Sequence, residues 1–277
     1  MKRSEIKVAV LQIEGSNCEE ETAAVYRHLG AQAEIVHLNQ LAGDRVRVED
    51  RRRLADYDVL MLPGGFSAGD YVRAGAIFAA RLKSALRKDL EQFIGSGKPV
   101  GGFCNGFQIL VELGALPGLS GPIADSPEAV LHINDSAKYE CRPTLLRYEG
   151  SRCRFTSELR RGKVLSIPSA HAEGKLLFPS SRDAAMRRKL RENGQVVFRY
   201  VDDKGKPGKY PWNPSGTPDG VAALTNPAGN VFGMMPHPER AFFGWQHSDW
   251  TRGRDPAGPG DGRALFESVL RAAERAK

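Results

Sequence analysis

The sequence lacks paired cysteines. Its 277 residues include four, Cys18, Cys104, Cys141 and Cys153, and none belongs to a CxxC motif. So few cysteines in a chain of this length do not make a disulfide framework, and they favour reduced thiols in a reducing compartment. Zinc sites usually bring two cysteines close together in the sequence. We therefore expect no bound metal, and we expect a cytoplasmic protein.

Long apolar runs are also missing. No run approaches the ~20 consecutive apolar residues that span a bilayer. The first residues, MKRSEIKVAVLQIEG, combine basic and apolar stretches as signal peptides do. However, Gln12 and Glu14 interrupt the apolar part, and no small-residue cleavage site follows. We interpret this segment as the first strand of a cytoplasmic protein.

No GxxxxGK[ST] nucleotide-binding motif or recognised nucleic-acid motif is present. The net charge is nevertheless +7, with basic clusters scattered at 51–53, 160–161 and 186–191. Solvated helix faces explain such scattered clusters most simply. An acidic protein partner and nucleic acid are the alternatives.

Apolar runs alternate with helical patterns in the first half of the chain. We expect strands at 7–13, 33–38, 56–65 and 99–103, and helices at 18–31, 77–94 and 105–116. Strands that are apolar throughout belong to parallel sheets covered on both faces. This predicts a three-layer α/β fold, with a mostly parallel open sheet flanked by helices. Ligands bind such sheets beyond the carboxyl ends of their strands.

The second half contains short β-like runs, which add antiparallel strands to this fold. They are expected at 141–148, 163–170, 195–201, 220–225 and 230–236, with helices near 181–193 and at 262–276. Segments 202–220 and 252–262 are too rich in glycine and proline for regular structure. We predict a single domain, 1–277, with loop excursions near 117–140, 202–220 and 245–262.

The run GGFCNGF places Cys104 between Gly102 and Gly106 where a strand passes into a helix. This is the thiol counterpart of the G-x-S-x-G turn that exposes a nucleophile. The glycines remove side chains that would collide in a sharp turn, and the positive end of the helix favours a thiolate. The amide after Cys104 and the turn at 63–65 could hold an oxyanion. The alternative is that Cys104 is a small buried residue in a glycine-rich turn.

A cysteine nucleophile needs a histidine to move protons and a third group to orient it. Among six histidines, His237 is distinctive because it ends an apolar run in GMMPHPER. Flanking prolines restrict the backbone there, which suits a relay from Glu239 through His237 to Cys104. A plain surface turn is the alternative interpretation of this motif.

Four segments together resemble a known family: PGGFSAGDYVRAGAI, GGFCNGFQILVELGALPG, SAHAEGK and GMMPHPER. They are similar to the class I (triad) glutamine amidotransferases, whose fold is flavodoxin-like, and more narrowly to the glutaminase component of phosphoribosylformylglycinamidine synthase. The resemblance begins with LQIEGSNCEEET near residue 11 and extends to the final helix.

The resemblance implies roles for individual residues. It implies a triad of Cys104, His237 and Glu239. It also implies an oxyanion hole formed by the amides of Gly65 and Asn105. It implies a glutamine pocket bordered by Gly64, Phe66 and Gln108. It places His171 near the site, either as a substrate-side contact or as a structural loop histidine.

The resemblance also implies an activity. The chain would hydrolyse glutamine through a cysteine thioester and pass ammonia to a large ATP-dependent synthetase subunit that makes formylglycinamidine ribonucleotide for purine biosynthesis. It implies no cofactor in this subunit, ATP and Mg in the partner, and in some branches a third small subunit. Segments 119–140 and 209–220 depart from the pattern of the shortest members of this family. How the chain docks with its partner subunits therefore stays open. The alternatives are a glutaminase serving another synthetase and a non-catalytic regulatory module.

Overall fold

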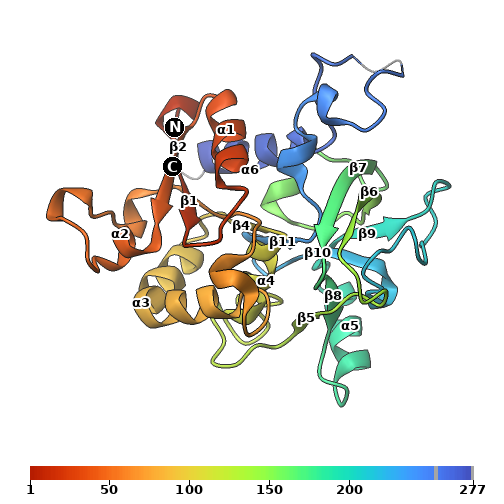
Figure 1. The fold of residues 1–277 in the computed structure, drawn as a ribbon, viewed down its shortest axis with the longest axis horizontal. Coiled ribbons are helices and arrows are strands. Elements are labelled where there is room, and N and C mark those ends of the chain that lie inside the picture. Colours follow the sequence, from red (N-terminus) through yellow and green to blue (C-terminus); the bar gives the residue numbers. More distant parts are fainter. Residues whose placement is uncertain (253–254, 276–277) are drawn as a thin grey trace.

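The computed structural model describes residues 1–252 and 255–275. One nine-stranded sheet runs through the molecule in the order β2-β1-β3-β4-β11-β10-β9-β6-β7 (Figure 1). Its first five strands are parallel: β2 (Gln32–His37), β1 (Lys7–Gln12), β3 (Val59–Leu62), β4 (Val100–Phe103) and β11 (Val231–Met234). The remaining strands pair antiparallel: β10 (Val221–Thr225), β9 (Val196–Val201), β6 (Glu140–Tyr148) and β7 (Val164–His171).

Helices cover both faces of the parallel half. They are α1 (Glu19–His28), α2 (Leu38–Ala42), α3 (Ala76–Gly95), α4 (Asn105–Glu112) and α6 (Arg263–Arg275), whereas α5 (Asp183–Glu192) lies beside the antiparallel half, near β8. Alternate side chains of β1 explain the layering, since Ala9 and Leu11 join the core under α3 and α4 whereas Val8 and Val10 join the core under α1 and α6. The predicted α/β class, with parallel strands and added antiparallel ones, is confirmed.

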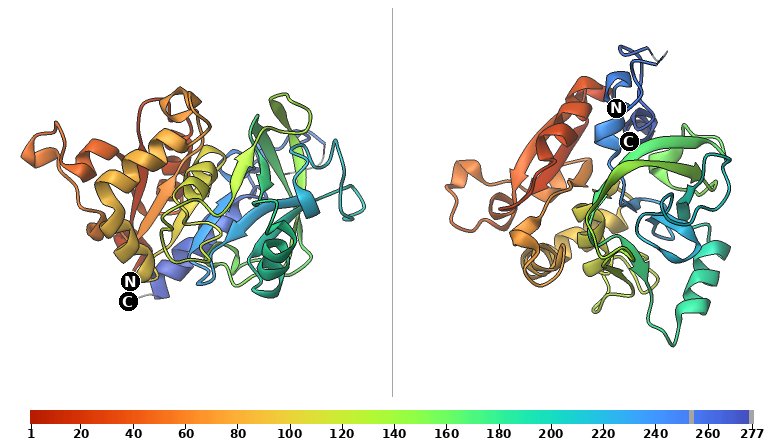
Figure 2. Two further views of the ribbon diagram at one scale, coloured as in Figure 1. Left: turned by 90° about the horizontal axis from the view of Figure 1, so that it is seen from below. Right: turned by 45° about the vertical axis from the view of Figure 1, so that its right-hand side comes forward.

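The ends of the described chain lie side by side. The views place the N-terminus beside the end of α6 (Figure 2), and the Met1 amino group donates to the Glu274 carbonyl at 3.2 Å. Because α6 returns to β1, residues near both ends share one core. The last expected helical residue, Ala276, lies outside the described residues, as do 253–254 in the third loop excursion.

Three elements were not expected from the sequence. A two-stranded sheet pairs β5 (Val130–His132) with β8 (Lys175–Leu177), and α2 follows β2 directly. The pairing of β5 with β8 fastens the 117–140 excursion to the loop that leaves β7. No helix in the described parts of the chain is long and apolar enough to cross a membrane.

Candidate active site

Cys104 occupies a sharp turn between β4 and α4. Its φ of 50° is uncommon for a residue with a side chain, and the turn fits because glycines stand two residues before and two residues after it. A Cβ on Gly106 would lie 1.9 Å from the Leu62 carbonyl oxygen, and one on Gly102 would lie 2.4 Å from the Gly106 oxygen. The expected nucleophile turn is therefore present, and Cys104 is 6% exposed.

His237 reaches this turn from the neighbouring strand. Because β11 pairs with β4, the Cys104 amide donates to the Met234 carbonyl at 2.8 Å. A Cβ on Gly64 would lie 2.7 Å from His237 Cε1 and 3.4 Å from Cys104 Cβ, so imidazole and thiol lie against the same backbone position. The His237 amide donates to the Pro168 carbonyl of β7 at 2.8 Å. Three strands thus fix the pair.

Glu239 contacts the other side of the imidazole. Its Oε1 lies 2.5 Å from His237 Nδ1, and Pro238 between the two begins a short 3₁₀ turn, Pro238–Ala241. Nε2 is buried without a hydrogen-bond partner among the described residues. The order carboxylate, imidazole, thiol is the order that a relay requires.

Burial and charge act on His237 in opposite directions. Burial disfavours the imidazolium, but the Glu239 carboxylate and the Cys104 sulfur outweigh it and hold the pKa of His237 well above its usual range. An imidazolium at this position can supply a proton to a leaving amine.

Gly64 and Gly65 follow β3 in a loop held by the segment after β1. The amides of Asn17 and Cys18 both donate to the Gly64 carbonyl, at 3.2 and 3.1 Å. Gly65 has a φ of 143°, and a Cβ there would meet the Asn17 amide at 2.7 Å. Within the described residues, the amides of Gly65 and Asn105 donate to no acceptor. Two unused donors beside the thiol are what an oxyanion hole requires.

The side chains of Asn105 and Gln108 form a buried network. Asn105 accepts from the Ser67 hydroxyl at 2.6 Å and donates to Gln108 Oε1 at 2.9 Å. Gln108 Nε2 in turn donates to the Glu173 carbonyl at 2.7 Å. These bonds tie the loop after β3 and the loop after β7 to the first turn of α4. The side chain of Gln108 holds the walls of the site in place.

His171 ends β7 and is 2% exposed. Its Nδ1 lies 3.1 Å from Asn134 Oδ1, which also accepts from the Gly174 amide at 3.1 Å. Asn134 Nδ2 donates to the His171 carbonyl at 2.8 Å, so the amide oxygen faces Nδ1 and Nδ1 carries the proton. Burial, followed by the charge of His237, lowers the pKa of His171 to about 4. His171 is therefore neutral, and its buried Nε2 has no partner among the described residues.

The exposed rim of the site is aromatic. Phe66 is 51% exposed, and its ring centroid lies 6.3 Å from that of Tyr139. Burial and the nearby Cys104 sulfur raise the pKa of Tyr139. Phe66 was expected from the sequence to border the substrate, whereas Tyr139 was not expected. Tyr139 lies in the 117–140 excursion. The sequence alone does not place this segment relative to the site, because its position depends on how β5 and β6 pair.

Cys18, to which the sequence pattern gives no role at the site, lies beside the candidate triad. Its sulfur is 3.9 Å from His237 Nδ1 and accepts from Arg240 Nη2 at 3.2 Å. Burial raises the pKa of its thiol. The signal that could have found it is topological, because the GSNC segment leaves β1 at the same edge as the loops after β3 and β4.

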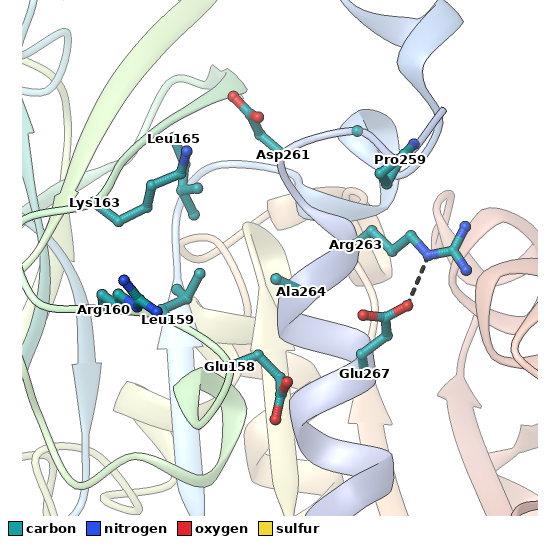
Figure 3. Close-up of a pocket in the computed structure, with 11 residues that line it drawn as sticks. Glu158, Leu159, Arg160, Lys163, Leu165, Pro259, Asp261, Arg263, Ala264 and Glu267 are labelled. Atoms are coloured by element: carbon teal, nitrogen blue, oxygen red, sulfur yellow. Dashed lines mark hydrogen bonds and ion pairs between the residues drawn. The ribbon is translucent and has the colours of Figure 1, made fainter. Parts of the chain in front are cut away.

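A separate pocket of about 640 Å³ lies between the segment before β7 and the start of α6 (Figure 3). None of the candidate site residues lines it. Three of its charged side chains are in ion pairs, since Arg263 pairs with Glu267 at 2.8 Å and Glu158 with Arg271 at 2.6 Å. It contributes nothing to the chemistry at Cys104.

Comparisons with known proteins identify the family. A family model for CobB/CobQ-like glutamine amidotransferase domains matches residues 5–271. The chain is 54% identical over 272 residues to phosphoribosylformylglycinamidine synthase subunit PurQ of Archaeoglobus fulgidus, covering 98% of each chain. It is 42% identical over 263 residues to the same subunit of Picrophilus torridus, covering 94% of this chain and 96% of that one.

Solved structures agree as well. A chain of PurLQS from Thermotoga maritima is 29% identical, with a TM-score of 0.70 over 97% of this chain and 99% of that chain. The glutaminase domain of Trypanosoma brucei CTPS, 13% identical with a TM-score of 0.55 over 96% of this chain and 94% of that chain, shares the fold. The chain therefore belongs to the CobB/CobQ-like glutamine amidotransferase family and, within it, to the PurQ subunits of phosphoribosylformylglycinamidine synthase.

Proposed function

We propose that this chain supplies ammonia from glutamine to a phosphoribosylformylglycinamidine synthetase, with Cys104 as nucleophile. The observation that carries the proposal is the line of Glu239, His237 and Cys104 around Gly64, with Glu239 Oε1 2.5 Å from His237 Nδ1. Cys104 attacks the side-chain carboxamide of glutamine, and the amides of Gly65 and Asn105 stabilise the tetrahedral oxyanion. Collapse breaks the C–N bond and leaves a glutamyl thioester.

His237 moves the protons in both halves of the reaction. As imidazolium it protonates the departing amine through Nε2, which releases ammonia. The neutral imidazole then takes a proton from water, which attacks the thioester and frees glutamate and the thiol. Glu239 keeps Nδ1 protonated throughout, so that Nε2 exchanges the proton. No step uses a metal or an organic cofactor in this chain. ATP and Mg belong to the amination in the partner.

Phe66 and Gly64 border the glutamine in this proposal, and His171 faces the substrate side. The free lone pair on His171 Nε2 makes that residue a hydrogen-bond acceptor. Gln108 acts indirectly, by fixing the Glu173 carbonyl and Asn105. The single nine-stranded sheet supports our proposal that residues 1–277 form one amidotransferase domain.

The partners follow from the family. The Thermotoga maritima relative was solved as PurLQS, and we propose that this chain likewise works with a large synthetase subunit and a small third one. All four cysteines are free thiols, which supports a reducing compartment such as the cytoplasm.

Reconstitution tests the proposal. The chain, its synthetase partners, glutamine, ATP, Mg and formylglycinamide ribonucleotide should yield glutamate and the amidine product. Cys104→Ala should abolish the glutamine-dependent reaction and retain the ammonia-dependent one, because the synthetase is untouched. Cys141→Ala, at an exposed thiol on β6, is the matched control and should behave as wild type. Normal glutamine use by Cys104→Ala would refute the nucleophile assignment.

A further inference from the structure

Cys18, His237 and Glu239 bring three potential metal-ligand atoms together near Nδ1 of His237. The proposed relay does not use this group of three as such. One ligand atom from each of Cys18, His237 and Glu239 lies within 4.8 Å of the others. All three side chains are buried, with residue exposures of 1%, 3% and 1%. Cys18 comes from the loop after β1, and the other two come from the loop after β11.

The chemistry of this set suits a thiophilic divalent cation. Thiolate, imidazole and carboxylate are the ligands that zinc takes in proteins. With metal–ligand bonds of about 2.0–2.3 Å, tetrahedral neighbours lie roughly 3.3–3.8 Å apart. The 3.9 Å between Cys18 Sγ and His237 Nδ1 is close to that separation.

Glu239 provides an independent indication of a ligand. Its Oε1 accepts from His237, but its Oε2 is buried with no hydrogen-bond partner in the described part of the chain. A buried carboxylate oxygen without a partner is costly. A metal ion bound by Oε2 would give this oxygen a partner. Nδ1 of His237 would then exchange its hydrogen bond to Glu239 for a bond to the ion.

Arg240 covers the set from the solvent side. Its Nη2 lies 3.2 Å from Cys18 Sγ and 3.3 Å from Glu21 Oε1, and its side chain is 39% exposed. A partly exposed arginine can swing outward with little loss of packing, which opens a route for an ion. The ion must also displace the thiol proton of Cys18, as zinc does when it binds cysteine.

We propose that Cys18, His237 and Glu239 bind zinc or a similar thiophilic divalent cation, and that the bound ion inhibits glutamine hydrolysis. Coordination through Nδ1 leaves the imidazole proton on Nε2. Nε2 then cannot take a proton from the water that hydrolyses the thioester, so turnover stops with the ion in place. The ion is an inhibitor rather than a cofactor. Its inhibitory effect rests on the proposed function, whereas its binding does not.

Binding is tested with Co²⁺, which takes zinc's ligands and gives a thiolate charge-transfer band in the near ultraviolet. A Cys104→Ala chain removes the nucleophile as a competing ligand and should show the band. Cys104→Ala/Cys18→Ser should lose it, and Cys104→Ala/Cys141→Ser, the matched control, should keep it. Cys104→Ala/Glu239→Gln retains the thiol and should bind Co²⁺ at least about tenfold more weakly. A band that survives Cys18→Ser, or unchanged affinity in the Glu239 variant, would overturn the site.

Inhibition is tested in the reconstituted complex. Glutamine-dependent activity is expressed relative to each variant's own metal-free rate. The zinc concentration that halves it should be at least about tenfold higher for Cys18→Ser than for wild type. Ammonia-dependent activity controls for zinc acting on the synthetase. Equal zinc sensitivity of wild type and Cys18→Ser would contradict the proposal, since the ion would then act through Cys104. Failure of glutamine use without zinc would instead contradict the proposed function.

Discussion

In the proposed mechanism Glu239 acts only through His237, and its effect can be separated from that of Cys104. Glu239→Gln removes the charge that raises the pKa of His237 and replaces one acceptor oxygen with an NH2 donor, so that the His237 tautomer is no longer fixed. We expect kcat with glutamine to fall roughly 10²–10⁴-fold. The alkaline limb of the pH profile should move to lower pH, because His237 then loses its proton earlier. Ammonia-dependent activity is the control, and an unmoved alkaline limb would argue against this role.

His171 makes stability depend on pH. Its pKa is lowered to about 4 by burial, whereas in the unfolded chain it is about 6.5. Between these values the unfolded state binds the extra proton, so the free energy of unfolding falls as pH falls from about 6.5 to 4, by roughly 3 kcal/mol.

A His171→Gln variant isolates this contribution. Glutamine can still donate to Asn134 but does not titrate, so the variant should lack that part of the pH dependence. Urea denaturation at several pH values measures the difference. Parallel curves for wild type and variant would show that His171 is not neutral in the folded state.

Local sequence patterns indicate some residues of the candidate site but not others. Cys104 could be singled out because a strand, a glycine turn and a helix surround it locally, and His237 because two prolines flank it, with Glu239 directly after the second. Cys18 could not, because its significance depends on the strand order, which brings the loop after β1 beside the loop after β11. Likewise, only the bonds of Asn134 explain how His171 is oriented.

The turn between β4 and α4 depends on space as much as on backbone freedom. Gly106→Ala would drive a Cβ to within 1.9 Å of the Leu62 oxygen, which belongs to the neighbouring strand. We expect a loss of at least about 1–3 kcal/mol of stability and a larger loss of glutamine-dependent activity, because α4 would be pushed from β3.

Gly95 offers a matched control for that substitution. It ends α3, and a Cβ there meets nothing within 4 Å. Gly95→Ala should leave stability unchanged or raise it by up to about 1 kcal/mol, as measured by thermal or urea unfolding. Equal effects of the two substitutions would show that contact with β3 is not the constraint.

At the scale of elements, hydrophobic pattern and turn residues predicted all nine strands of the main sheet and five helices. The sequence did not predict β5, β8 and α2. The two strands are three residues each and α2 is five, too short to establish a period. Their stability comes from tertiary pairing, such as that of Leu131 with Leu176, which local sequence does not encode.

For the whole molecule, the exposed apolar residues near the active site define the side on which a synthetase should dock. Tyr71 and Val72 are 89% and 71% exposed and follow the loop that also carries Phe66. The Ala74 amide donates to Glu173 at 3.1 Å, which ties this segment to the loop after β7. Ammonia released at Cys104 can avoid solvent if the partner covers this rim.

Tyr71→Asp should therefore weaken binding to the synthetase at least about tenfold, since it introduces a charge into a buried apolar contact. Val48→Asp is the control, because Val48 is 75% exposed and follows α2, which comes directly after the edge strand β2. Analytical ultracentrifugation or calorimetry measures both. Equal weakening, or none, would place the docking surface elsewhere.

The pairing of β4 with β11 also has a consequence for protein synthesis. The thiol and the imidazole stand on neighbouring strands, but the ribosome makes Cys104 long before His237. Until β11 has emerged and inserted beside β4, the Cys104 amide lacks its Met234 acceptor and the thiol lacks its base. A nascent or truncated chain therefore carries an inert cysteine. In the proposed mechanism, the chain therefore becomes competent only when β11, the last strand in chain order, is inserted beside β4.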